Sequence, residues 1–366
     1  MQYNKFTREQ IVFITFASGC GNMAFNFIWA VYLTGRGAWV ALAMGILITI
    51  PFSMMIFSLS KKYPENNIFD IIRINFGTMV YTIVVTINAA INIILAVTIL
   101  NFLTGTVKVY FLQTTPVWVI MLFVLVTALL FTNNKILLFG RTIEFLTIWY
   151  IINYFAGFSL GFVKEFQMKN IVPVFDTSIL RFGEAVYFSL ASASEILLTV
   201  IVIIGHMPQK DENRKSVIKG SGLWAFILAL AVFIMQGISG YELLLRTSSV
   251  GVEISRAIYF GDFFRGLELF ILATYQLITT LRIALYLYSA CIPIKKLMRE
   301  KFYFAILIFI SIIIMMLSIK LNSYNKAFFM SIFIDYYVLL PFIIFVLILG
   351  FLGSHIMKKG FGSDNK

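Results

Sequence analysis

Two charged residues lie deep inside apolar stretches of this chain, where charge is costly. Glu195 follows a row of small residues, and Arg282 lies in a later apolar stretch. A charged side chain at mid-membrane costs about 2.5–3.5 kcal/mol on insertion scales, so neither residue is expected to face lipid unpaired. Two interpretations stay open. Either the two residues pair and lock their helices together, or Glu195 faces a bound amine while Arg282 occupies the place of a cation.

Two stretches of small and polar residues interrupt otherwise apolar segments. The first is 17–22 (ASGCGN), and the second is 189–195 (SLASASE). Three explanations compete for the first: a lipoprotein cleavage site before Cys20, a face for close helix packing, or a broken helix whose freed backbone binds a ligand. The sequence that follows, MAFNFIWAVYL, is still apolar, which argues against cleavage because a mature lipoprotein would turn polar there.

The broken-helix interpretation gains weight because the two stretches occupy equivalent places. If the chain consists of two repeats of five helices, each stretch lies in the first helix of its repeat. Paired interruptions in corresponding helices of inverted repeats indicate a transporter-type binding site. Freed N–H groups there can hold a carboxylate, and freed C=O groups can hold an ammonium or a cation. The predicted ligand-binding residues of the two stretches are Gly19, Cys20, Gly21, Asn22, Ser189, Ser192, Ala193 and Glu195.

Two further segments place polar side chains on one helical face. Asn88 and Asn92, four residues apart, either bond a neighbouring helix or line a polar cavity. We expect both of them, and Tyr275, to contact the ligand, with Thr279 and Arg282 in structural or gating roles. The last three belong to a helical stripe that consists of Tyr275, Thr279, Arg282 and Tyr286, with Glu268 continuing it outward.

Signatures of enzyme chemistry do not occur in the sequence. It has no P-loop, no H-E-x-x-H or G-x-S-x-G motif, and no Cys/His spacing typical of a metal site. His206 and His355 are isolated residues near the ends of apolar stretches, and two cysteines, Cys20 and Cys291, imply no disulfide framework. The sequence therefore predicts a protein that is not an enzyme and that uses no cofactor or metal.

The composition identifies the broad class of protein. Hydrophobic residues make up 60% of the 366, charged residues make up 13%, and the mean hydropathy is +0.91. Soluble domains have about 45–50% apolar and about 25% charged residues, so the composition predicts a polytopic membrane protein. The net charge of +12 does not indicate nucleic-acid binding, because the basic residues are spread between apolar stretches. The predicted all-α fold has about ten spans, near 10–33, 37–59, 78–103, 115–134, 142–163, 183–205, 218–238, 264–290, 303–320 and 333–354.

The charges of the connecting loops predict the orientation. With the N-terminus inside, Lys and Arg are in excess in the inside loops, which favours both termini inside. The segment 66–76, with apolar residues at helical spacing, is expected to form an interfacial helix on that side. The whole chain is expected to be one membrane domain, with repeat 1 at about 10–163 and repeat 2 at about 183–354.

Several short motifs, taken in their order and spacing, resemble a known family, the membrane B subunits of spore-germination nutrient receptors, also called spore permeases. Glu195 is similar to the acidic residue of that family's sixth span, and Arg282 stands where the family usually has a basic residue. The other motifs that carry the resemblance are Arg36-Gly37-Ala38-Trp39, Lys62-Tyr63-Pro64 followed by Gly77, Thr115-Pro116-Val117-Trp118, Arg141 with Glu144, Asn170-Ile171-Val172-Pro173-Val174, and Arg265 with Glu268.

This resemblance implies a fold, a location and partners. The family belongs to the amino acid–polyamine–organocation superfamily. The resemblance therefore implies a leucine-transporter-type 5+5 inverted repeat with broken helices 1 and 6. It implies a multi-pass protein of the spore inner membrane that senses a small nutrient, an amino acid or a similar molecule. The implied partners are a receptor A subunit, a lipoprotein C subunit and membrane lipid. Three functions stay open: a sensing receptor subunit, a secondary amino-acid permease, and a scaffold or ion-conducting subunit.

Overall fold

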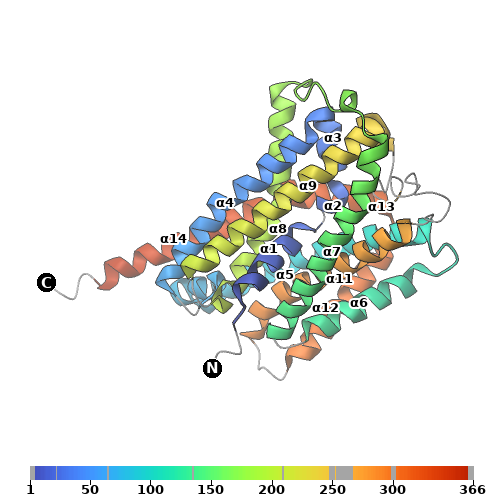
Figure 1. Ribbon diagram of the computed structural model, residues 1–366. Coiled ribbons are helices and arrows are strands. Elements are labelled where there is room, and N and C mark those ends of the chain that lie inside the picture. Colours follow the sequence, from blue (N-terminus) through green and yellow to red (C-terminus); the bar gives the residue numbers. More distant parts are fainter. Residues whose placement is uncertain are drawn as a thin grey trace.

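A computed structural model describes residues 5–21, 23–63, 66–133, 136–207, 210–246, 252, 267–297 and 302–361, and their regular structure is entirely helical (Figure 1). The first half contains α1 (Arg8–Gly19), α2 (Met23–Asn26), α3 (Ile28–Thr34), α4 (Ala38–Lys62), α5 (Ile68–Tyr110), α6 (Val117–Thr132) and α7 (Ile136–Glu165). The second half contains α8 (Ile179–Ile203), α9 (Lys210–Arg246), α11 (Leu267–Lys295), α12 (Tyr303–Leu321), α13 (Tyr324–Ile334), the π-helical turn η6 (Asp335–Leu339) and α14 (Leu340–Phe361).

Each of the ten predicted spans contains helix, but the lengths differ from the expectation. Among the described residues, seven helical stretches are individually long and apolar enough to cross a membrane. The difference arises partly because the first predicted span is divided among α1, α2 and α3, and because α6 has only 16 residues. The last predicted span, 333–354, begins earlier than expected, since α13, η6 and α14 follow one another without a gap from Tyr324.

The predicted interruption of the sixth span is wrong. The helix α8 runs without a break through 189–195. Alanine is a strong helix former, and the Ser194 hydroxyl donates to the Leu190 carbonyl of its own helix at 2.8 Å, so the stretch stays helical. The small residues of α8 serve packing instead: the Ser189 hydroxyl donates to the Leu42 carbonyl of α4 at 2.6 Å, and a Cβ on Gly45 would collide with Ser189.

Glycines divide two of the long helices. Gly77 in α5 has φ +83°, and Gly240 in α9 has φ +72°, values that L-residues with a side chain rarely adopt. The first separates the helical segment before it from the long span that follows, so the helix predicted at 66–76 is confirmed. Asn67 caps this segment through a reciprocal pair of hydrogen bonds with Asp70.

Helix ends that the loop charges assign to one side of the membrane do lie together. The Phe6 N–H donates to the His206 carbonyl after α8, and Arg8 pairs with Glu212 at the start of α9. At the same end, Lys61 of α4 pairs with Asp211, and Lys62 donates to the Ser354 hydroxyl of α14. The start of α1 and the end of α14 therefore share one end of the bundle (Figure 1). Which side of the membrane this end faces stays a prediction.

The bundle core is formed by the helices that surround α1. The helix α1 packs against α7, α8 and α9, while α4 packs along both α8 and α9. On the other side α11 packs along α5 and against α6 and α7. Because α1 is buried among these helices, it forms part of the core.

Candidate functional site

The helix of the first span stops in the middle of the bundle. A Thr7–Gln10 capping box starts α1, and the helix ends at Gly19, followed by Cys20 and Gly21 in non-helical conformation. The chain becomes helical again at Met23. The predicted break in the first span is therefore confirmed. Asn22, the fourth predicted residue of this stretch, lies outside the described residues.

The break is close to the two charged residues that the sequence singled out. Arg282 of α11 donates to the Glu195 carboxylate of α8 through Nε at 3.1 Å and through Nη2 at 2.5 Å. The Tyr286 hydroxyl donates to the same oxygen at 2.5 Å, and Arg282 Nη1 donates to the Thr199 hydroxyl at 3.4 Å. The pairing that was one of the two open interpretations is therefore present.

Burial makes this charged network energetically important. Glu195 and Arg282 are each only 1% exposed, and the guanidinium carbon of Arg282 lies 4.2 Å from the centre of the Tyr286 ring. In a buried pair, removal of one partner typically costs about 3–5 kcal/mol, because the other charge is left uncompensated. The network therefore ties α8 and α11 together, as an ion pair with two neutral groups around it.

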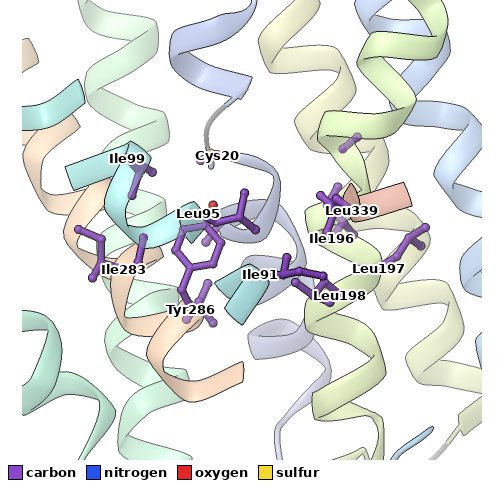
Figure 2. Packing of buried hydrophobic residues seen from close by; sticks show 14 of the residues in the cluster. Cys20, Ile91, Leu95, Ile99, Ile196, Leu197, Leu198, Ile283, Tyr286 and Leu339 are labelled. Carbon is purple, nitrogen blue, oxygen red and sulfur yellow. The ribbon is translucent and has the colours of Figure 1, made fainter. Parts of the chain in front are cut away.

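The small size of Gly21 allows the network to approach the broken helix. A Cβ at Gly21 would collide with the Glu195 carboxylate and come within 2.8 Å of the Tyr286 hydroxyl oxygen. Figure 2 shows the Tyr286 side chain directed toward Cys20. Gly19 has a different neighbour: its Cβ would collide with the indole of Trp224 in α9. Gly21 therefore belongs to the charged centre, and Gly19 to the packing of α1 on α9.

A second polar cluster lies one helical turn away along α8. The Ser192 hydroxyl donates to Asp335 Oδ2 at 2.6 Å, and Asn26 Nδ2, at the end of α2, donates to the same oxygen at 3.0 Å. Asn26 Nδ2 also lies 3.4 Å from the Ser331 hydroxyl of α13. Asp335, Asn26 and Ser192 are at most 1% exposed. This cluster joins the broken first span, α8 and the π-helical turn of the last span.

Sequence reasoning missed Asp335 and Asn26. Both are polar residues in apolar stretches, MAFNFIW and IFIDYYV, and that signal was available. Asp335 lies at the predicted start of the last span, where a carboxylate normally faces the membrane surface. It is buried because the helix begins one further segment upstream, at Tyr324. The π-turn that carries it is a feature found frequently at functional sites.

Most of the remaining predicted residues bond neighbouring helices or their own helix. Asn88 Nδ2 donates to the Ser289 carbonyl of α11 at 2.9 Å, and Asn92 Nδ2 donates to the Asn88 carbonyl at 2.8 Å. The bond to α11 matches the helix-bonding alternative for Asn88. Thr279 donates to the carbonyl of Tyr275, whose ring lies edge-on to Phe25 at 4.9 Å. Ser189 bonds α4 and stays outside both clusters, whereas Ala193 is buried without a polar role.

Comparison with known proteins identifies relatives by sequence and by structure. The family described as "Spore germination protein" matches residues 5–327. The protein YfkT of Bacillus subtilis (strain 168), provisionally named as a spore germination protein, is 21% identical over 254 residues, which are 69% of each chain.

Two transporters of known structure share the fold. The structure of MhsT in complex with L-phenylalanine has a TM-score of 0.64 at 11% identity, over 94% of this chain and 89% of that one. Mhp1, a nucleobase-cation-symport-1 family transporter in a closed conformation with bromovinylhydantoin bound, has a TM-score of 0.62 at 13% identity, over 89% and 75%. Both have the leucine-transporter fold, so this chain has that fold as well.

Proposed function

The chain belongs to the spore germination protein family, and from that premise we propose that it is the membrane subunit of a nutrient receptor. In this proposal a small amino-acid-type ligand binds beside the break in the first span, and its binding triggers germination. The receptor would work in the spore inner membrane, together with an A subunit and a lipoprotein C subunit. The coarser statement, a transporter-like multi-pass membrane protein, rests on the family and the shared fold.

One observation carries the proposal: α1 ends in the bundle interior beside two buried polar clusters. The carbonyl groups at the C-terminal end of a helix have no intrahelical partner and favour positive charge nearby. The two clusters add the carboxylates of Glu195 and Asp335. MhsT, which has the same fold, is described in complex with L-phenylalanine, and this supports an amino acid as the kind of ligand.

The contacts of Arg282 favour a receptor over a sodium-coupled permease. Its guanidinium is buried in the centre of the bundle, bonded to Glu195 and Thr199. A fixed positive charge disfavours a metal cation close to it by direct repulsion. Arg282 would then order this region without a bound ion.

Spores provide the direct test of the receptor proposal. Spores that retain this chain as their only membrane receptor subunit are compared with spores that lack it, using each amino acid as the stimulus. We expect a dose-dependent response only when the chain is present, and its return when the gene is restored. Equal responses from both kinds of spore would contradict the receptor proposal and leave the permease as the alternative.

A further inference from the structure

The site has two buried acidic residues, Glu195 and Asp335. Among the described residues, Asp335 forms no direct ion pair. It is 0% exposed and lies in the π-helical turn of the last span. Glu195, by contrast, is paired directly with Arg282. Arg282 acts on Asp335 electrostatically, but its hydrogen bonds go to Glu195 and Thr199. The centre thus contains two carboxylates and one guanidinium.

The hydrogen bonds of Asp335 leave a specific acceptor open. Its Oδ2 accepts from Ser192 and Asn26, whereas no donor among the described residues reaches Oδ1, which is buried. A buried carboxylate is stable only if it is paired with a positive group or is neutralised by a proton. A positively charged donor at Oδ1 would supply both the missing hydrogen bond and the compensating charge.

Asn26, which is hydrogen-bonded to Asp335, supplies a second open acceptor. Its amide orientation follows from its partner, because Nδ2 faces the Asp335 carboxylate at 3.0 Å and a flipped amide would place two oxygens together. Its Oδ1 is then buried, and no donor among the described residues reaches it. Two neighbouring acceptors, one of them charged, match a group that has several N–H donors and a positive charge.

We propose that Asp335, with Asn26 and Ser192, recognises the protonated amine of the ligand. This inference rests on the proposed function, since it names the chemistry of the ligand bound at the same site. An ammonium group has three donors and no acceptor. One N–H can bond Asp335 Oδ1 and another Asn26 Oδ1, and the positive charge offsets the second carboxylate. Glu195, predicted from the sequence to face the amine, instead holds Arg282 in place.

The π-helical turn and the broken helix place these groups together. Asn26 lies at the end of α2, directly after the break in the first span, and Asp335 opens η6. Ser192 of α8, one turn before Glu195, donates to the same Asp335 oxygen as Asn26 does. A ligand amine bound here would therefore contact three spans that are distant from one another in the sequence. Its binding would order the first span against the last.

The test measures binding to the purified full-length chain in lipid nanodiscs by thermal unfolding. Each of the twenty amino acids is tested alone. Any that binds is compared with its decarboxylated amine and with its des-amino acid, and methyl- to butylammonium chloride are tested in the same way. The variants are Asp335→Asn and, because it keeps the carboxylate, Asn26→Ala. The matched control is Asp176→Asn, which removes an exposed carboxylate outside the site.

We expect the amino acid and its amine to bind wild-type protein, and the des-amino acid to bind at least about tenfold more weakly. Asp335→Asn should weaken amine binding by at least about tenfold, Asn26→Ala by a few-fold, and Asp176→Asn not at all. If Asp335→Asn does not fold, the result for Asn26→Ala decides, because unchanged amine binding there contradicts the inference.

The remaining outcomes separate this inference from the proposed function. Amino-acid binding that is unchanged in Asp335→Asn would overturn the inference while the ligand-binding function stands. The same holds if Glu195→Gln, rather than Asp335→Asn, removes recognition of the amine. Binding of alkylammonium ions alone, dependent on Asp335, would support the inference and contradict an amino acid as ligand. If neither class binds wild-type protein, both proposals are wrong.

Discussion

The two buried carboxylates of the site differ in what surrounds them. Glu195 accepts from Arg282 and Tyr286, so its charge is compensated within the protein. Asp335 accepts only from neutral groups, Ser192 and Asn26, among the described residues. The first arrangement suits a structural role that holds two helices together. The second suits recognition of a positive group that arrives from outside.

The structural role of the ion pair predicts a large coupling between its two members. Arg282→Met leaves Glu195 buried without its partner and should lower the free energy of unfolding by about 3–5 kcal/mol. The double variant Arg282→Met with Glu195→Gln should lose much less, because no buried charge is left unpaired. Chemical unfolding of the purified single and double variants measures this coupling. Losses that simply add would contradict the structural role.

Gly21 lies so close to Glu195 and Tyr286 that no larger residue is expected to be tolerated at this position. Gly21→Ala introduces a Cβ that collides with Glu195, so the ligand response should fall strongly while the protein still reaches the membrane. The matched control is Gly222→Ala in α9, where a Cβ meets no atom within 4 Å. It should be neutral or stabilising by up to about 1 kcal/mol, since alanine favours helix over glycine. A normal response from Gly21→Ala would contradict the site.

At the level of elements, the sequence predicted two broken helices, and the structure confirms the one in the first span. In the first span two glycines, Gly19 and Gly21, weaken the helix and leave room for close neighbours, so the break follows from local chemistry. In α8 the interruption was inferred from serines and alanines. Alanine favours helix, and the Ser194 hydroxyl bonds a carbonyl of its own helix, so this stretch remains helical. Small polar residues in a membrane helix indicate either a break or a packing face. Only the neighbouring helix, here α4, decides between them.

Backbone exchange distinguishes the two helices directly. Hydrogen–deuterium exchange of the full-length chain should be slow for amides 189–195, which lie in the continuous helix α8. Exchange should be faster at 20 and 21, where the first span leaves helical conformation. Peptide mass spectrometry of protein in nanodiscs measures both segments in one experiment. Equal protection of the two segments would contradict the asymmetry between the first and sixth spans.

For the whole molecule, most of the architecture was predictable because the length and order of the apolar stretches indicate where membrane helices lie. The helix ends that loop charges assign to one side do meet, through contacts such as Phe6 with His206. The second polar cluster was not predicted, because it assembles from α2, α8 and η6, which are distant in sequence. Which oxygen of Asp335 lacks a donor is a property of that packing and has no local signal.

The central claim is that the site binds its ligand beside the broken helix without a coupling ion, because Arg282 orders this region itself. The most direct measurement is the affinity of the purified chain for an amino acid in sodium chloride and in choline chloride of equal ionic strength. Uptake into liposomes with and without a sodium gradient is measured in parallel. We predict equal affinity in both salts and little sodium-driven uptake. Uptake that requires a sodium gradient, and that persists in Arg282→Ala, would contradict the account and favour a permease.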